Sequence, residues 1–295
     1  MRIVVTGGSG IVGGFVVRNL LAAGHEVINA TRRRPRQDVP GVGFVQVDTT
    51  DMGQVVGVLT FRGKTAEAVI HLAALPNVWP VAPSPPTEVW RINALSVYNV
   101  AEACAQLGIM KFVETSSVNV HQYLRAEGRI APPRWPMDET TPDYVVNAYG
   151  LSKIAGEATA RMLHARTGAQ AISLRPALVI APDEYPMRIA QLRGGRPKTW
   201  LSWSYSDAED LAEAYRLSVE KDDLGCEAFY IVNDEAFTDE PIDTAIRMAY
   251  RDAGPLDINI HGHDADIANA KAKRLLGWKP QHSWHERERE VASNE

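Results

Sequence analysis

The chain has 295 residues, of which 45% are hydrophobic, 23% charged and 7% aromatic. This composition is typical of a folded globular protein and excludes a disordered tail, a collagen-like repeat and a membrane bundle. The 31 Lys and Arg against 36 Asp and Glu give a net charge of −5, so nucleic acid is not an expected partner.

The sequence contains no recognisable targeting or membrane segment. Met1 is followed directly by the strand-like Arg2-Ile3-Val4-Val5-Thr6. No apolar run approaches the roughly 20 residues that span a bilayer. Cys104 and Cys226 stand far apart and form no CxxC pair, so neither a disulfide nor a thiolate metal site is expected. We therefore expect a cytoplasmic protein with no membrane partner.

Short apolar runs alternate with segments of helical periodicity through the first part of the chain. The expected strands lie at 3–5, 27–28, 44–47, 68–70, 112–113 and 171–174. The expected helices run from 12 to Gly24, from about Asp51, from 86 to 107 and from 149 to 167. This alternation predicts an α/β Rossmann fold, a doubly wound parallel sheet with helices on both faces.

After Pro176 the chain becomes rich in turn residues. We expect residues 1–176 to form an NAD(P)-binding Rossmann domain, to which some later segments return. Residues 177–295 would form a small C-terminal substrate-binding subdomain. Within it we expect helices near 208–220, 240–251 and 266–276 and a strand at 229–232.

Three glycines follow the first expected strand at positions 7, 10 and 13. Glycines in such a strand-to-helix turn let the backbone approach a pyrophosphate and direct the helix N-terminus at it. An isolated triplet also occurs in ordinary turns, but this one opens a βαβ unit. We therefore predict that Gly7, Gly10, Ile11 and Val12 bind a dinucleotide.

The segment after the second expected strand bears on the choice between NAD and NADP. An acidic residue at this place binds the adenosine ribose, but this chain has Thr31-Arg32-Arg33-Arg34. Thr31 can hydrogen-bond a 2′-phosphate, and Arg32 or Arg33 can form charge-assisted bonds with it. We predict NADP, with NAD as the alternative cofactor. The alternative reading of these arginines is a solvated surface turn.

A tyrosine and a lysine stand four residues apart on one expected helix. Tyr149 and Lys153 would share a helix face, and an ammonium beside a phenol favours the phenolate that accepts a proton from a carbinol. Thr115-Ser116-Ser117 ends an expected strand, where ligands bind in such sheets. The pattern predicts a catalytic site of Ser117, Tyr149 and Lys153.

Taken together, these motifs resemble the extended short-chain dehydrogenase/reductases, in particular the NAD-dependent epimerase/dehydratase family. The similarity rests on segments in the family's order over nearly the whole chain: Thr6 to Gly13, Asp48, His71 to Ala74, Asn93, Ser116-Ser117, Tyr149 to Lys153, Arg175-Pro176 and Leu276 to Pro280. The resemblance implies that Ser117 holds the substrate hydroxyl and that Tyr149 with Lys153 transfers the proton. It also implies a homodimer through the helices at 86–107 and 149–167.

The resemblance extends the expected cofactor site. Asp48 would contact the adenine, and the segment from Leu72 to Ala74 would line the cofactor. The full expected set is Gly7, Gly10, Ile11, Val12, Thr31, Arg32, Arg33, Asp48, Leu72, Ala73, Ala74, Asn93, Ser116, Tyr149, Lys153 and Pro176.

Two departures from the family pattern narrow the expected chemistry. Ser117-Val118-Asn119 stands where dehydratases have Thr-Asp-Glu, so dehydration is not expected. Val120-His121-Gln122 stands where many nucleotide-sugar epimerases have Val-Tyr-Gly. The short second domain is instead similar to that of the compact uronate and sugar dehydrogenases.

Candidate substrate contacts are Asn77, Trp79, Arg188 and Trp203. Indoles stack on sugar rings and arginines bind carboxylates or phosphates, although packing tryptophans and solvated arginines are the ordinary alternatives. No metal is expected at His261 and His263, because no further ligands are spaced to close a site and Asp266 suits a helix N-cap.

We expect an NADP-preferring oxidoreductase that removes hydride from a secondary carbinol of a sugar or sugar-derived substrate. A nucleotide-sugar epimerase with a tightly held cofactor would use the same residues. A non-catalytic NADP-sensing regulator is a further alternative, although Tyr149 and Lys153 are both present.

Overall fold

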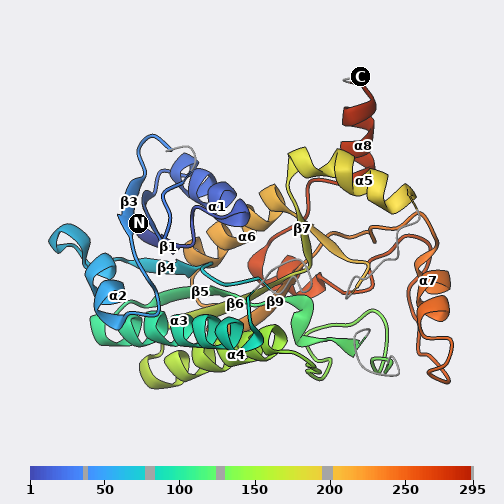
Figure 1. The fold of residues 1–295 in the computed structure, drawn as a ribbon, viewed down its shortest axis with the longest axis horizontal. Helices are drawn as coiled ribbons and strands as arrows, with labels where there is room; N and C mark the ends of the chain where they lie inside the picture. Colours follow the sequence, from blue (N-terminus) through green and yellow to red (C-terminus); the bar gives the residue numbers. More distant parts are fainter. Residues whose placement is uncertain (36–38, 77–83, 124–129, 195–201, 294–295) are drawn as a thin grey trace.

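A seven-stranded, wholly parallel sheet forms the centre of the protein (Figure 1). The computed structural model describes residues 1–35, 39–76, 84–123, 130–194 and 202–293. In sheet order the strands are β3 (Gly43–Gln46), β2 (Glu26–Thr31), β1 (Arg2–Thr6), β4 (Ala68–His71), β5 (Lys111–Thr115), β6 (Gln170–Pro176) and β9 (Cys226–Ile231). This order confirms the predicted doubly wound Rossmann sheet.

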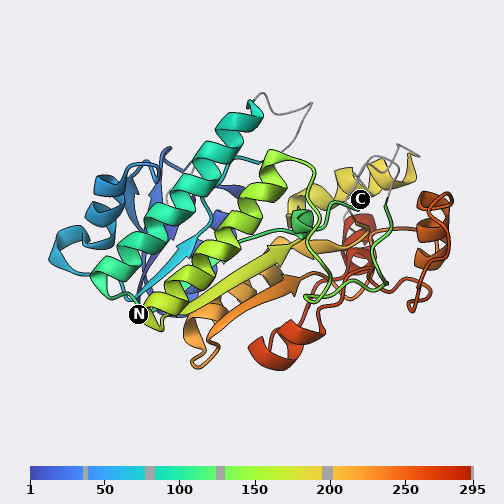
Figure 2. The same ribbon diagram turned by 90° about the horizontal axis from the view of Figure 1, so that it is seen from below.

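Helices cover both faces of this sheet (Figure 2). One face carries α1 (Ile11–Ala22) and α6 (Ala208–Glu220), and the other carries α2 (Met52–Leu59), α3 (Pro86–Leu107) and α4 (Ala148–Thr167). Successive side chains of a strand point to opposite faces, so Ile3 and Val5 pack with α1 and α6 while Val4 packs with the other layer. Burial on both faces explains why these strands read as continuous apolar runs.

Strand β9 belongs to the central sheet, whereas the sequence placed a strand at 229–232 in the smaller part. Phe229 lies opposite Leu174 of β6, and Phe229 and Ile231 are both fully buried in the core beneath α1 and α6. A strand that is apolar on both sides is stable inside a parallel sheet covered by helices. Residues 208–231 therefore return to the Rossmann core.

The smaller part of the protein lies beyond the carboxyl end of the sheet (Figure 2). It contains β7 (Leu178–Ile180) paired with β8 (Tyr205–Asp207), and the helices α5 (Tyr185–Arg193), α7 (Ile242–Ala249) and α8 (Trp284–Ser293). Earlier residues reach it too, because Trp135 bridges to Ile258 and Met137 bridges to Ile267. Residues before 176 thus reach the smaller part, and residues 208–231 return to the central sheet. The division into domains at 1–176 and 177–295 stays a prediction.

The predicted helix at 266–276 is shorter in the structure, and its predicted N-cap is wrong. A π-helix covers Ala272–Leu276. Asp266 lies outside it and accepts hydrogen bonds from the backbone N–H groups of Trp203 (3.1 Å) and Ser204 (2.7 Å). Asp266 therefore connects the residues just before β8 to the C-terminal segment. Its burial raises the pKa of this carboxyl to about 6.

In the described part of the chain, no helix combines the length and apolar character needed to cross a membrane. Cys104 and Cys226 are both free thiols, as the sequence predicted.

Candidate active site

The loop between β1 and α1 is built on glycines that the surrounding backbone requires. Gly7 has a φ of +73°, and a Cβ on it would lie 2.7 Å from the Ala73 nitrogen. A Cβ on Gly13 would lie 2.3 Å from the Gly7 oxygen. Gly10 differs, since a Cβ there would meet only the Gly7 oxygen, at 3.3 Å. The close backbone of the turn therefore requires glycine at positions 7 and 13, and it is less restrictive at position 10.

Two cavities flank Gly10. The first has a volume of about 210 Å³ and lies over the carboxyl ends of β1, β2 and β4. Its lining includes Gly7, Gly10, Ala30, Thr31, Arg32, Val47, Asp48, Thr49, Leu72, Ala73, Ala74 and Ile92. Eight predicted cofactor residues therefore meet in one place, at the end of a parallel sheet where dinucleotides bind.

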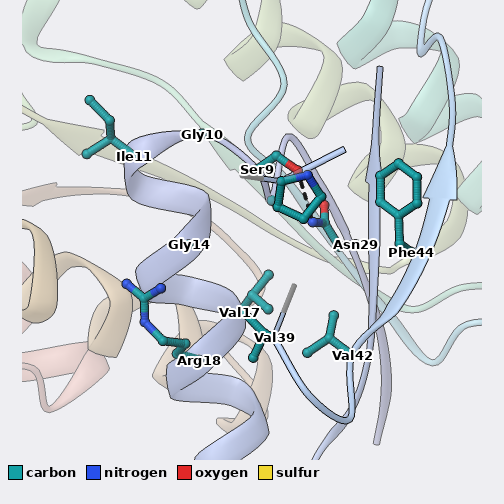
Figure 3. A pocket seen from close by; sticks show the side chains of 12 residues that line it. Ser9, Gly10, Ile11, Gly14, Val17, Arg18, Asn29, Val39, Val42 and Phe44 are labelled. Atoms are coloured by element: carbon teal, nitrogen blue, oxygen red, sulfur yellow. Dashed lines mark hydrogen bonds between the residues drawn. The ribbon is translucent and has the colours of Figure 1, made fainter. Parts of the chain in front are cut away.

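The second cavity, of about 360 Å³, lies between α1 and the chain that joins β2 to β3 (Figure 3). Asn29 of β2 donates a hydrogen bond to the Ser9 hydroxyl at 3.1 Å, which fastens the glycine loop to β2. Ile11 lines this cavity, whereas the Val12 side chain packs against the sheet core. A cofactor contact by Val12 would therefore come from its backbone N–H.

The three consecutive arginines after β2 occupy different places. Arg32 lines the first cavity beside Asp48. Hydrogen bonds from Thr50 are the main cause that lowers the pKa of the Asp48 carboxyl, and the charge of Arg32 lowers it further. Arg33 is exposed and is not among the described lining residues of either cavity. Arg34 lies over the Phe44 ring, 5.8 Å from its centroid. Arg32 is thus the arginine best placed to meet a ligand phosphate.

Tyr149 and Lys153 lie on α4 next to the carboxyl end of β5. Asn147 caps the helix by accepting a hydrogen bond from the Gly150 N–H at 2.9 Å. Lys153 Nζ donates to the Thr115 carbonyl at 2.7 Å and lies 5.2 Å from the centroid of the Tyr149 ring. The structure therefore brings together the three elements that the sequence singled out, namely the end of β5, Tyr149 and Lys153.

The two serines after β5 face different ways. Ser117 Oγ accepts hydrogen bonds from the backbone N–H and the side-chain amide of Asn119, at 3.1 and 3.0 Å. Ser116 is fully buried and donates to Glu157 Oε1 at 2.6 Å. The Ser116 hydroxyl is thus held inside the protein by a carboxylate, and the cofactor contact predicted for this residue stays a prediction.

Asn93 likewise uses its amide within the protein. Its Oδ1 accepts from the Leu75 N–H at 2.7 Å, and its Nδ2 donates to the Leu75 carbonyl at 3.0 Å. With 4% of its surface exposed, Asn93 fixes the segment after β4 that lines the first cavity. The Asn93 amide therefore positions this segment, and the predicted contact of Asn93 with the cofactor stays a prediction.

A buried ion pair that the sequence analysis did not identify lies behind the serines. Arg175 of β6 holds Glu157 of α4 with two hydrogen bonds, Nε to Oε1 at 2.7 Å and Nη2 to Oε2 at 2.8 Å. A third nitrogen of Arg175 donates to the Tyr230 hydroxyl at 3.2 Å. Such a bidentate ion pair fixes the orientation of the guanidinium and the carboxylate. It ties α4, which bears Tyr149 and Lys153, to the sheet.

Glu114 of β5 is a second buried carboxyl, and it lines a small cavity together with Lys153. It is 2% exposed, its Oε1 has no hydrogen-bond partner among the described residues, and a Cβ on Gly156 of α4 would lie 3.1 Å from its Oε2. Burial raises the pKa of Glu114 to about 7, against the opposing charge of Lys153. A small cavity lined by Glu114, Lys153 and Gly156 separates β5 from α4 here.

Replacing Glu114 with glutamine should alter the pH dependence of stability. A folded-state pKa above the unfolded value of 4.5 means that the protonated acid favours the folded state. This contribution is complete below pH 4.5 and is lost as the pH rises through about 7. Glu114→Gln should therefore gain about 3 kcal/mol over wild type in urea unfolding at pH 8.5 and little at pH 4. An equal difference at both pH values would contradict this environment.

The predicted substrate contacts divide into two groups. Asn77 and Trp79 lie outside the described residues. Trp203 is 8% exposed and packs with Trp135 in the core of the smaller part, so little of its indole is available to a sugar. Arg188 faces Glu184 one turn away on the same segment, with 3.7 Å between the charged atoms. The described candidates therefore give no support to a sugar contact.

One group of described residues has the spacing of metal ligands, namely Asp207, Glu209 and His282. Arg287 already forms ion pairs with both carboxylates, so their negative charge is neutralised by the protein itself. We assign no metal to this cluster.

The comparisons with known proteins agree with this geometry. Residues 3–231 match the sequence profile of the NAD dependent epimerase/dehydratase family. A UDP-glucose 4-epimerase of Lacticaseibacillus casei is 26% identical over 333 aligned positions, which cover 97% of each chain. An L-arabinose 1-dehydrogenase (NAD(P)(+)) of Haloferax volcanii is 31% identical over 62% of this chain and 69% of that protein.

A solved structure has the same fold over its whole length. The UDP-glucose 4-epimerase of Thermotoga maritima, crystallised with UDP-glucose, superposes with a TM-score of 0.74 over 100% of both chains, at 21% identity. Its agreement extends to the smaller part as well as to the Rossmann sheet.

Proposed function

Because the chain belongs to the NAD dependent epimerase/dehydratase family, we propose that it oxidises a secondary carbinol of a sugar or sugar-derived substrate at Tyr149, Lys153 and Ser117. The observation that supports this most strongly is the placement of Lys153. Its Nζ is bound to the carbonyl at the end of β5 and lies beside the Tyr149 ring, one turn of α4 away. The predicted base and its cation are therefore assembled where ligands bind in such sheets.

Each of the three side chains has a distinct task. Tyr149 Oη accepts the proton of the carbinol hydroxyl as the carbon gives up its hydride. The Lys153 ammonium stabilises the phenolate form of Tyr149 by its charge. Ser117 donates a hydrogen bond to the substrate oxygen as this becomes a carbonyl oxygen. The product is a ketone or a lactone.

The described residues fit a nicotinamide dinucleotide, which would supply the hydride acceptor when bound. A Cβ on Gly10 would contact the Gly7 oxygen at the first turn of α1, and among the described residues no side chain caps the N-terminus of this helix. Its free N–H groups can bind a pyrophosphate. Thr31, Arg32 and Asp48 would surround the adenosine, and the segment from Leu72 to Ala74 would line the cofactor beyond the glycine loop.

We further propose NADP as the preferred cofactor, on the basis of Arg32. A guanidinium that lines the first cavity can bind a 2′-phosphate, which NAD lacks. Arg32→Ala should raise the KM for NADP about tenfold or more and leave the KM for NAD within about twofold, since a charge-assisted bond contributes ~1.5–3 kcal/mol. Steady-state kinetics with both cofactors measures this effect.

The matched control for this change is Arg34→Ala, because Arg34 lies over Phe44 and outside the described lining of the first cavity. It should leave both KM values unchanged. If Arg32→Ala has the same ratio of KM values as wild type, the preference for NADP does not come from this residue.

The choice between dehydrogenase and epimerase turns on the fate of the hydride. Net release of reduced cofactor defines a dehydrogenase, and the L-arabinose 1-dehydrogenase relative supports this reading. Return of hydride to the opposite face defines an epimerase, which the full-length match to a UDP-glucose 4-epimerase supports. We favour the dehydrogenase because this chain has Val120-His121-Gln122 where many nucleotide-sugar epimerases have Val-Tyr-Gly.

A substrate panel tests this proposal. Purified protein with NADP or NAD is mixed with free sugars, sugar acids and nucleotide sugars, and both reduced-nicotinamide absorbance and sugar products are followed. Steady reduction with L-arabinose or glucuronate would identify a dehydrogenase. Conversion of UDP-glucose into its epimer without net reduction would identify an epimerase. Cofactor binding without either reaction would leave the NADP-sensing regulator.

We also propose a homodimer in which α3 and α4 of two copies pack together. Both helices expose large apolar side chains on the outer side of the sheet, with Trp90, Tyr98 and Leu151 each at least 40% exposed. Such side chains gather where protein surfaces associate. Light scattering should give twice the chain mass, and a monomer at micromolar concentration would contradict this assembly.

A further inference from the structure

A line of three side-chain hydrogen bonds runs from the start of α4 to the hydroxyl of Ser117. The backbone N–H of Val146 donates to Gln122 Oε1 at 2.7 Å, and Gln122 Nε2 donates to Asn119 Oδ1 at 3.3 Å. Asn119 Nδ2 then donates to Ser117 Oγ at 3.0 Å. Gln122 is fully buried and Ser117 is 5% exposed, whereas Asn119 between them is partly exposed.

One backbone group fixes the direction of the whole line. A backbone N–H can only donate, so Gln122 must turn its oxygen toward Val146. The Gln122 amide nitrogen then faces Asn119, whose side-chain oxygen must accept the hydrogen bond. This leaves the Asn119 amide nitrogen toward Ser117. Neither amide can be reversed without setting two donors or two acceptors against each other.

This direction determines what Ser117 has left to offer. A hydroxyl has two acceptor lone pairs and one proton to donate. Ser117 Oγ accepts from the Asn119 side chain at 3.0 Å and from the Asn119 backbone N–H at 3.1 Å. Both lone pairs are therefore used, and only the O–H remains for a ligand.

The segment that contains these amides is fixed against the turn that starts α4. Gln122 N donates to the Tyr144 carbonyl at 2.6 Å, and Tyr144 N donates to the Val120 carbonyl at 2.8 Å. A Cβ on Gly150 would lie 2.6 Å from the Asn119 carbonyl oxygen and 2.9 Å from Gln122 Oε1. The glycine permits this close approach one residue after Tyr149.

We propose that Asn119 and Gln122 are positioning residues that make Ser117 an obligate hydrogen-bond donor to the substrate oxygen. A Ser117 without acceptor capacity cannot take the carbinol proton, which leaves this role to Tyr149 rather than to Ser117. The donated O–H bond strengthens as the substrate oxygen becomes a carbonyl oxygen. This inference rests on the proposed function and explains why an amide pair occupies this segment.

Two substitutions of Asn119 separate this role from simple packing. Asn119→Asp keeps the shape and still accepts from Gln122, but it offers Ser117 an acceptor, so the serine proton turns toward it and away from the substrate. We expect kcat to fall about a hundredfold, as when one oxyanion donor is removed. Asn119→Ala leaves the Ser117 proton free, and we expect a fall of less than about tenfold. A purely structural role predicts the opposite order, because alanine loses more contacts.

A double-mutant cycle with Ser117→Ala completes the test. Assays use NADP with whichever of L-arabinose, glucuronate and UDP-glucose gives the fastest turnover, and NADP affinity is measured by fluorescence titration to verify folding. In the Ser117→Ala background, Asn119→Asp should have less than about a twofold further effect on kcat, because it acts through the serine. Gln122→Glu provides a second variant, since two carboxylate oxygens would force Asn119 to present its oxygen to Ser117.

The outcomes distinguish this inference from the proposed function. Asn119→Ala as damaging as Asn119→Asp, or an undiminished loss from Asn119→Asp in the Ser117→Ala background, would overturn the positioning role. Ser117→Ala with wild-type kcat would instead overturn the proposed role of Ser117 in the reaction. No turnover of any of the three sugars by wild type would remove the basis of both.

Discussion

Tyr149→Phe should lower kcat about a thousandfold and change the affinity for NADP by less than about threefold. The phenol oxygen is the proposed proton acceptor, and a positioned acid–base group contributes about 10²–10⁴ to the rate. Phenylalanine keeps the ring beside Lys153, whose Nζ remains bound to the Thr115 carbonyl. The glycine loop and the first cavity lie on other elements and are unaffected. Steady-state kinetics with fluorescence titration of NADP measures both quantities.

The split between the two quantities is what makes this test specific. A loss of NADP affinity in parallel with kcat would indicate that the ring is needed for binding. Activity of Tyr149→Phe within about tenfold of wild type would exclude Tyr149 as the proton acceptor, whatever its position on α4.

The second large effect is expected on stability, from the Glu157 and Arg175 pair. Arg175→Met should cost about 3–5 kcal/mol, because it leaves the Glu157 carboxylate buried without its main partner. Glu157 is 3% exposed, and apart from Arg175 its described partners are the Ser116 hydroxyl at 2.6 Å and Arg161 at 3.9 Å. Urea unfolding followed by tryptophan fluorescence measures the free energy of unfolding.

The control is the double variant Glu157→Met/Arg175→Met. Replacing both charges with apolar side chains of similar length removes the uncompensated carboxylate, so we expect most of the lost stability to return. If the double variant is less stable than Arg175→Met alone, the loss in Arg175→Met does not come from an unpaired buried carboxylate. The pair then stabilises the folded state through the attraction between its two charges. If Arg175→Met costs less than about 1 kcal/mol, the carboxylate has found another partner.

Local patterns in the sequence were enough to predict the sheet and the helix that bears Tyr149 and Lys153. Apolar runs on both faces of a strand, the glycine turn and the spacing of Tyr149 and Lys153 each depend on residues close together in the chain. The same holds for α3 and α6, whose ends match the predicted bounds. Strand β9 was placed wrongly because its partner, β6, lies far away in the sequence.

The sequence could not identify the hydrogen-bond and ion-pair partners of the polar residues around the site, although it indicated that some of these residues are buried. Glu114 and Arg175 each interrupt an apolar strand, which marks a buried ionisable group. Nothing local identified Glu157 as the partner of Arg175. Asn119 and Gln122 were noticed only as departures from a family pattern, because their direction depends on the backbone N–H of Val146.

The measurement that tests the central claim most directly is a single turnover with enzyme in excess. Protein loaded with NADP is mixed rapidly with L-arabinose, glucuronate or UDP-glucose, and the absorbance of reduced nicotinamide is followed. Oxidation of a carbinol at Tyr149 predicts a rise in wild type, lasting for a dehydrogenase and transient for an epimerase, and no rise in Tyr149→Phe on the same timescale. An equal rise in both proteins, or none in wild type with any of these sugars, would contradict it.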